Sequence, residues 1–192
     1  MRIDHDLSAN SMIYASVSTG YKSGGTQDGG ALYKPETLTN YEIGAKFSFL
    51  GGHLTWNSAA YYEDFKNYQL SAPITYTNGA HGLGFVNVGG NTKVMGFESE
   101  FAYAQGNDRA NLILSVIPKK TLGTEKYAGS NDYYIAAPCP AGAPLGVSNC
   151  EDISGNTLPH APNVSLTALY EHAFMLANGA RPLVADAEGN TP

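Results

Sequence analysis

The fold class of this chain is decided by the stretch PETLTNYEIGAKF at residues 35–47 and by YASVSTGY at residues 14–21. In the first stretch and just beyond it, every second residue is apolar, namely Tyr41, Ile43, Ala45, Phe47 and Phe49. The second stretch shows the same period more weakly, with an apolar set of Ile13, Ala15 and Val17. Because a period of two places residues on one face of a β-strand, each stretch predicts a strand with one apolar face.

The same alternation returns in four further stretches, at residues 54–63, 93–103, 111–117 and 162–174. In the second of these, the carboxylates Glu98 and Glu100 share the face opposite to Phe97 and Phe101. The chain ends, at residues 1–6 and 181–185, look like pieces of two more strands. We therefore predict an all-β chain with about six complete antiparallel strands plus two partial ones.

The connections between the predicted strands alternate between short and long. Short connections fall at residues 7–10, 50–52, 105–108 and 176–180, and long ones at residues 22–38, 67–91 and 119–160. An up-and-down transmembrane β-barrel produces this alternation, because tight turns close one rim and long loops close the other. A soluble Greek-key sandwich has no reason to sort its loops in this way. The predicted fold is thus part of an antiparallel transmembrane barrel.

The composition excludes several classes of protein. The 192 residues suit one domain or part of one, and 22 Gly with 13 Tyr at only 15% charge are typical of tyrosine-bearing strands, not of a helical bundle. A net charge of -6, without any run of Lys or Arg along the sequence, argues against nucleic acid as a partner. The sequence contains no run of 18 apolar residues, so no transmembrane helix is predicted. The first six residues are too polar to open a signal peptide.

Two cysteines, Cys139 and Cys150, lie in a segment rich in Pro, Gly and Ala. Their spacing does not match a zinc site, which needs four ligands in paired clusters. We predict a disulfide that closes this loop and that persists in an oxidising compartment. The alternative is a pair of free loop thiols in a reducing cytosol.

No catalytic, metal or cofactor site is predicted. The five histidines are scattered and are interpreted as surface or rim residues: His5, His53, His81, His160 and His172. Glu98 and Glu100 share a strand face that points into a wet lumen, so they are not predicted to act as a general acid and base. No Gly-x-Ser-x-Gly motif occurs.

Six aromatic residues are predicted to form a girdle at a lipid interface, with ordinary core packing as the alternative for each. They are Tyr14, Trp56, Tyr62, Tyr68, Tyr103 and Tyr170.

Five stretches of the chain resemble, in order, segments of the barrels of TonB-dependent outer-membrane receptors. They are YASVSTGYKSGG at residues 14–25, PETLTNYEIGAKF at 35–47, AAYYEDFKNYQ at 59–69, NVGG with VMGFESEFAY at 87–103, and SGNTLPHAPNVSLTALYEHAF at 154–174. Such receptors have a 22-stranded barrel around an N-terminal plug. They import ferric siderophores, cobalamin or sugars with energy drawn through the TonB complex. The resemblance implies that residues 1–192 form part of one such barrel domain, without its plug, in the bacterial outer membrane.

The resemblance also implies the partners of the chain. They are outer-membrane lipid, a solute such as a ferric siderophore, and the TonB complex, which acts through a plug domain absent from this sequence. The three long connections are expected to capture the solute, with candidate contacts at Tyr68, Tyr76, His81, Tyr133, Tyr134 and His160. The two histidines would lie on the outer side, where a ferric ligand is met.

Two other functions are compatible with the sequence. The first is a small, self-sufficient barrel that serves as an adhesin or membrane anchor, which would need an export signal and a closing strand. The second is a secreted, sugar-binding β-domain held by the Cys139–Cys150 bridge. Apolar faces turned to solvent would argue against this second alternative.

Overall fold

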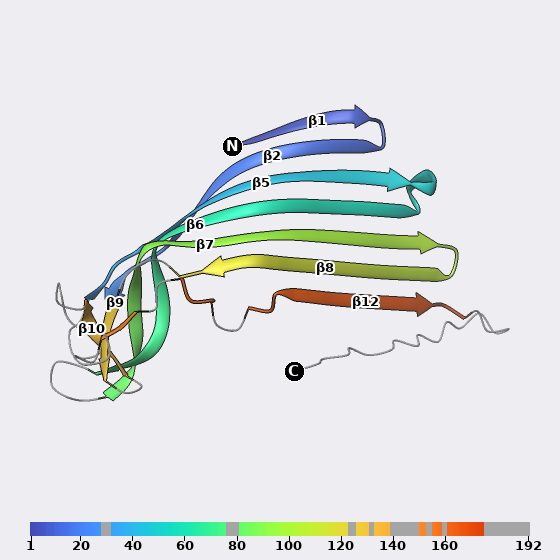
Figure 1. The fold of residues 1–192 in the computed structure, drawn as a ribbon. Coiled ribbons are helices and arrows are strands. Elements are labelled where there is room, and N and C mark those ends of the chain that lie inside the picture. The colour runs from blue at the N-terminus through green and yellow to red at the C-terminus, as the bar shows by residue number, and fades with distance from the viewer. Residues whose placement is uncertain are drawn as a thin grey trace.

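Seven long strands form one antiparallel sheet in the computed structural model, which describes residues 1–27, 32–75, 81–122, 126–130, 133–138, 150–152, 155–158 and 161–174. The strands are β1 (Arg2–Ser8), β2 (Ser11–Lys22), β5 (Glu36–Phe49), β6 (Leu54–Thr75), β7 (His81–Gln105), β8 (Asp108–Thr121) and β12 (Val164–His172). Each pairs with the next in this series, and Figure 1 shows β1 and β12 at opposite edges of the sheet. This is the predicted all-β, up-and-down arrangement, open as expected for part of a barrel.

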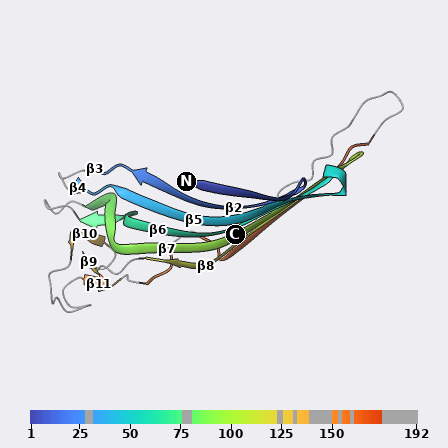
Figure 2. The ribbon, with the colours of Figure 1, turned by 90° about the horizontal axis from the view of Figure 1, so that it is seen from above.

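The two ends of the sheet differ. The turn end carries the tight connections, including the 3-10 turn η2 (Leu50–Gly52). The loop end carries the short strands β3 (Gly25–Thr26), β4 (Leu32–Tyr33), β9 (Lys126–Ser130), β10 (Tyr133–Pro138) and β11 (Cys150–Asp152), as Figures 1 and 2 show. One of these, β10, runs parallel to β6, unlike the antiparallel pairs of the long strands. Within the described part of the chain, no helix is long and apolar enough to cross a membrane.

The predicted short connections at residues 7–10, 50–52 and 105–108 are confirmed. Gly51, Gly52 and Gly106 adopt φ angles of 67°, 97° and 60°, in the left-handed region that favours glycine, so the chain reverses within a few residues. The fourth predicted turn, at residues 176–180, and the partial strand at 181–185 lie outside the described residues. The partial strand predicted at residues 1–6 is confirmed as β1.

The long connection predicted at residues 67–91 was wrong over most of its length. β6 and β7 continue into it as a hairpin and stay paired from Tyr68–Val88 to Thr75–His81. The pairing is interrupted by a bulge between Lys66 and Tyr68, where Asn67 has a φ of 52°. Residues 89–90 of β7 lie opposite Asn67 alone, so the bulge breaks, in β7, the period of two on which the prediction was based.

The connection predicted at residues 119–160 begins later than expected, since β8 runs to Thr121. It is partly ordered, as predicted: β9, β10 and β11 lie within it, and Thr121 forms an isolated antiparallel bridge with Thr157.

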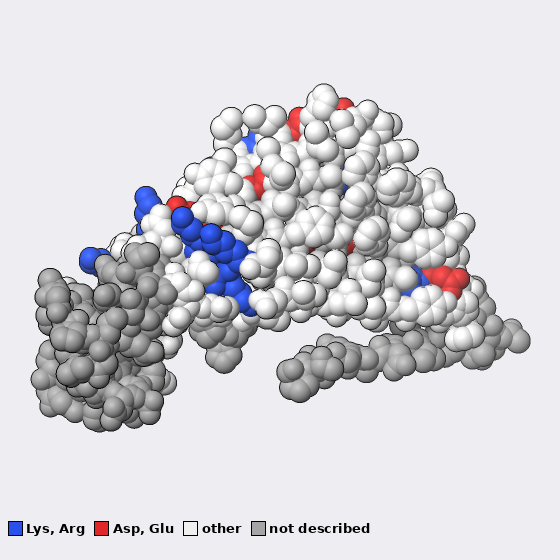
Figure 3. All heavy atoms as spheres, viewed as in Figure 1, with Lys and Arg blue, Asp and Glu red and all other residues white. Residues whose placement is uncertain are grey.

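The register gives the sheet one apolar face and one polar face. One cross-strand row on the apolar face passes through all seven long strands and consists of Ile3, Ala15, Ile43, Ala60, Phe97, Val116 and Val164. The adjacent row on the polar face consists of Asp4, Tyr14, Gly44, Ala59, Glu98, Ser115 and Ser165. Figure 3 shows that the apolar face carries few charges.

The apolar face is exposed and does not form a core. Ile43 and Leu166 are each 64% exposed on it. Among the described residues, the buried hydrophobic side chains are Val86, Val88 and Leu122, which cluster at the loop end. A water-soluble domain would bury a sheet face of this kind, so the arrangement fits a sheet that meets lipid.

Candidate functional site

The polar face carries a group of charged side chains near the middle of the sheet. Three adjacent rows across β5, β6 and β7 consist of Glu42–Tyr61–Gly96, Gly44–Ala59–Glu98 and Lys46–Asn57–Glu100. A hollow of about 180 Å³ lies here, and its lining includes Tyr14, Lys46, Asn57, Glu98 and Glu100. Three carboxylates thus accompany one lysine, so this part of the face is negative and attracts water.

Two tyrosines on the polar face lie over glycines of the neighbouring strand. A Cβ atom on Gly44 would overlap the ring of Tyr14, and one on Gly96 would overlap the ring of Tyr61. The guanidinium of Arg2 lies 4.0 Å from the centre of the Tyr14 ring. The side chain of Tyr14 therefore belongs to the polar face, and its predicted place in a lipid-facing girdle was wrong. Its odd-numbered neighbours, Ile13 and Ala15, occupy the apolar face instead.

Aromatic side chains do form a row on the apolar face at the turn end. The ring of Trp56 stacks on Phe47 and Phe101, at centroid distances of 5.2 and 5.6 Å. The indole nitrogen of Trp56 also donates a 2.9 Å hydrogen bond to the hydroxyl of Ser99. Tyr103 and Tyr170 share this face at the turn end, as the predicted girdle requires, whereas Tyr62 lies on the same face opposite Met95, toward the loop end.

Tyr68 is the remaining member of the predicted girdle, and it does not face outward. It is partly buried against the cluster of Val86, Val88 and Leu122, and its ring meets Phe65 edge-on at 5.5 Å. Burial raises the pKa of the Tyr68 hydroxyl, and the charge of Glu36 raises it further. Asn67, whose φ is 52°, interrupts the extended backbone of β6 directly before Tyr68, which explains why the prediction failed here.

The connection between β2 and β5 is fastened to the β6–β7 hairpin by amide side chains. Gln69 donates hydrogen bonds of 2.9 and 3.1 Å to the carbonyls of Ser23 and Lys34. Asn87 exchanges hydrogen bonds with the backbone of Lys34, at 2.6 and 2.9 Å, and Gln27 does the same with Phe85, at 2.7 and 3.1 Å. These bonds hold the described part of the connection against the hairpin. Sequence reasoning missed them, because nothing local marks an amide in an expected loop as a fastening.

The predicted ligand contacts are only partly described. The backbone of β10 lies beside the end of β6, with Tyr134 next to Ile74, and His81 pairs with Thr75 on the other side of β6. The backbone therefore brings the predicted contacts His81 and Tyr134 to the same end of the sheet. Tyr133 is the first residue of β10 and lies there as well. Tyr76 and His160 lie outside the described residues. So does Cys139, and the predicted disulfide to Cys150 is therefore untested.

Of the described histidines, His81 begins β7 at the loop end, whereas His5, His53 and His172 lie at the turn end or on an edge strand. His53 hydrogen-bonds through Nδ1 to the carbonyl of Ala104 at 2.9 Å, and His172 contacts Asp108 at 2.6 Å. In the described ranges, no group of three or more His, Cys, Asp or Glu residues is placed to hold a metal ion.

Three lysines come together on the apolar face at its loop end, although the sequence shows no run of basic residues. They are Lys66, Lys93 and Lys119, on three adjacent strands. The register places them together, and no local pattern in the sequence could have shown this.

The family model described as "TonB dependent receptor-like, beta-barrel" matches residues 3–181. No curated protein matches the chain.

Solved structures of similar fold include the ferric yersiniabactin uptake receptor FyuA from Yersinia pestis, which is 16% identical with a TM-score of 0.61 over 92% of this chain. The siderophore receptor PiuA from Acinetobacter baumannii is 20% identical, with a TM-score of 0.59 over 89% of this chain. The pyoverdine outer-membrane receptor FpvA from Pseudomonas aeruginosa PAO1 is 17% identical, with a TM-score of 0.55 over 91% of this chain. The chain spans 23%, 23% and 22% of the lengths of these three proteins.

Proposed function

We propose, because this chain belongs to the family of TonB-dependent receptor-like β-barrels, that it forms part of the wall of a bacterial outer-membrane receptor. The receptor would take up a solute with energy supplied through the TonB complex, which it would engage through a plug domain outside this sequence.

The observation that supports this proposal most is the sheet with one apolar, exposed face and one polar face. Lipid contains no partner for an open polar backbone, so a β-sheet crosses a membrane only with its strands paired and its outer side chains apolar. The row from Ile3 to Val164 meets the second requirement on every long strand. The exposure of this row argues against the alternative of a secreted, sugar-binding domain.

We propose a ferric siderophore as the solute. This choice of solute is supported by the three similar structures, which are described as receptors for ferric yersiniabactin, for a siderophore and for pyoverdine. Cobalamin and a saccharide are the other solutes to be tested. The loop end, fastened by Gln69, Asn87 and Gln27, would present the capturing surface.

The polar face would line the passage behind this surface. Its carboxylates, hydroxyls and amides keep water in the lumen, so a polar solute can exchange hydrogen bonds as it moves. The rings of Tyr14 and Tyr61 lie over glycines of the neighbouring strands and occupy the space that a larger side chain there would take.

The test is uptake by cells that express the full product of the reading frame encoding this chain. Accumulation of radioactive iron from a panel of ferric siderophores is compared with accumulation in a strain lacking the gene, with and without a protonophore. We expect uptake of at least one siderophore that depends on both the gene and the proton gradient. Uptake of labelled cobalamin or maltodextrin instead would change the solute, and no energy-dependent uptake of any of them would overturn the proposal.

A further inference from the structure

Three lysines form a cationic group on the apolar face, which we name the lysine ledge: Lys66 on β6, Lys93 on β7 and Lys119 on β8. Lys93 lies opposite Asp64, and Lys119 lies opposite Met95, two residues farther along β7. Diagonal neighbours on adjacent strands lie about 7–8 Å apart, so the three ammonium groups can reach one common ligand. Figure 3 shows blue atoms gathered at this end of a face that carries few other charges.

The charge of the ledge is not balanced within the described part of the protein. Among the described residues, Arg2 forms a salt bridge with Asp4, and His172 contacts Asp108, but both pairs lie away from the ledge. Asp64 brings a carboxylate opposite Lys93, and its Oδ2 accepts a 2.9 Å hydrogen bond from the amide of Asn91. Three positive charges and one negative charge therefore leave this site cationic.

The position of the ledge matches one surface of a membrane. Ten residues separate Lys93 from Tyr103 on β7, and no charged side chain faces outward between them. Ten residues span about 34 Å along a strand, or about 26 Å across a membrane at a tilt of about 40°, close to the height of an apolar barrel band. With Tyr103 at one interface, Lys93 lies at the other, at the level of lipid headgroups.

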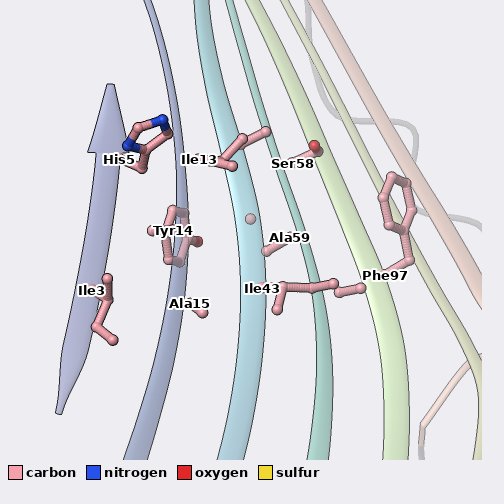
Figure 4. A pocket seen from close by; sticks show the side chains of 12 residues that line it. Ile3, His5, Ile13, Tyr14, Ala15, Ile43, Ser58, Ala59 and Phe97 are labelled. Carbon is pink, nitrogen blue, oxygen red and sulfur yellow. The ribbon is translucent and has the colours of Figure 1, made fainter. Parts of the chain in front are cut away.

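An apolar hollow of about 610 Å³ lies on the same face, toward the turn end from the ledge. It is lined by small side chains, including Ala15, Ala45 and Ala60, and by larger ones, including Ile43 and Phe97. Figure 4 labels Ala15, Ile43 and Phe97 among the lining residues. Phe97 is four residues from Lys93, or about 14 Å along β7. A chain that descends from the ledge would thus reach the hollow.

We propose that the lysine ledge binds the headgroup of an anionic, phosphate-bearing lipid, whose acyl chain enters the hollow. This inference rests on the proposed function, because it requires the apolar face to meet a membrane. Lipid is favoured over free phosphate because the ledge continues directly into an apolar surface.

The test uses the full product of the reading frame in phosphatidylcholine vesicles, with spin-labelled phosphatidic acid and spin-labelled phosphatidylcholine as probes. The preference of the protein for the acid is measured from the motionally restricted fraction of each probe. The ledge variant carries both Lys93→Gln and Lys119→Gln. The control carries Lys22→Gln and Lys46→Gln, which change the charge by the same amount on the polar face. The preference should fall about fivefold for each ledge lysine removed at low salt, and the control should keep it.

Asp64→Asn provides a change of opposite sign, since it removes the negative charge beside the ledge and should raise the preference. An unchanged preference in the ledge variant, or an equal fall in the control, would overturn the proposal. So would loss of the preference on adding inorganic phosphate, which would show a site for any small anion.

Failure of this proposal differs from failure of the proposed function. Protein that inserts into the vesicles without a lipid preference refutes only the ledge. Protein that does not insert into the vesicles refutes both the lysine ledge and the proposed membrane function. Solute uptake by cells is measured in a separate experiment.

Discussion

Replacing Trp56 by Phe tests the aromatic row at the turn end. The Phe ring can keep the two stacking contacts with Phe47 and Phe101, but it has no N–H to donate to Ser99. Ser99 is only 6% exposed, so its hydroxyl loses its side-chain partner away from water. We expect the free energy of unfolding to fall by about 1–3 kcal/mol, the cost of an unsatisfied buried polar group. Trp56→Ala also removes two stacking contacts of about 0.5–1.5 kcal/mol each and should cost correspondingly more.

The assay is reversible urea unfolding of the full product of the reading frame in lipid vesicles, followed by far-UV circular dichroism. Ser99→Ala is the matched variant, because it removes the same hydrogen bond from the other side. The double variant, Trp56→Phe with Ser99→Ala, should cost about 1 kcal/mol less than the sum of the two single changes.

Additive costs would refute this reasoning, because two residues that share no interaction contribute independently. Equal stability of Trp56→Phe and the unchanged protein would refute it as well, since the hydroxyl of Ser99 would then need no partner from the indole.

Three further predictions are tested by the same unfolding assay or by limited proteolysis. Gly96→Val places methyl groups against the ring of Tyr61 and should destabilise the sheet by about 1–3 kcal/mol, and adding Tyr61→Ala should restore part of this loss. Gln69→Leu removes two hydrogen bonds to the β2–β5 connection, so proteases should cut that connection faster; an unchanged cutting rate would contradict the fastening role. At the turn end, beyond the apolar band, the hydrogen bond with His172 is the main cause that holds the pKa of Asp108 below its ordinary 3.8. The ionised carboxylate therefore stabilises the fold at pH values above its ordinary pKa, and this stabilisation is lost as the pH falls through the lowered pKa of the folded protein. The free energy of unfolding should thus be lower at pH 3 than at pH 7. Asp108→Asn should make this difference in free energy smaller.

Much of the fold could be predicted, because alternation is a property of each strand by itself. In β5, the odd-numbered residues from Tyr41 to Phe49 are apolar whatever the strand pairs with. The tight turns were also predictable, since Gly51, Gly52 and Gly106 mark local reversals of the chain. The fold class, the three short connections that the structure describes and the existence of the seven described long strands were accordingly correct, although β6 and β7 are longer than predicted.

The candidate site was less predictable, because its parts depend on phase and on contacts distant in sequence. Tyr68 was expected to face lipid or ligand, but directly after Asn67, with its left-handed backbone, it packs against the cluster that contains Val88 and Leu122. Gln69 fastens a connection more than thirty residues away, which no local pattern could indicate.

The sequence by itself determined that this protein is a series of antiparallel strands with one apolar and one polar face, since a period of two is written within each strand. Only the tertiary structure decided which residues of different strands lie together. The register set the ring of Tyr61 over Gly96, extended β6 and β7 through an expected loop, and assembled a cationic ledge from Lys66, Lys93 and Lys119. The physical reason is that register depends on bulges and on hydrogen bonds between strands, and a shift of one residue would exchange the faces.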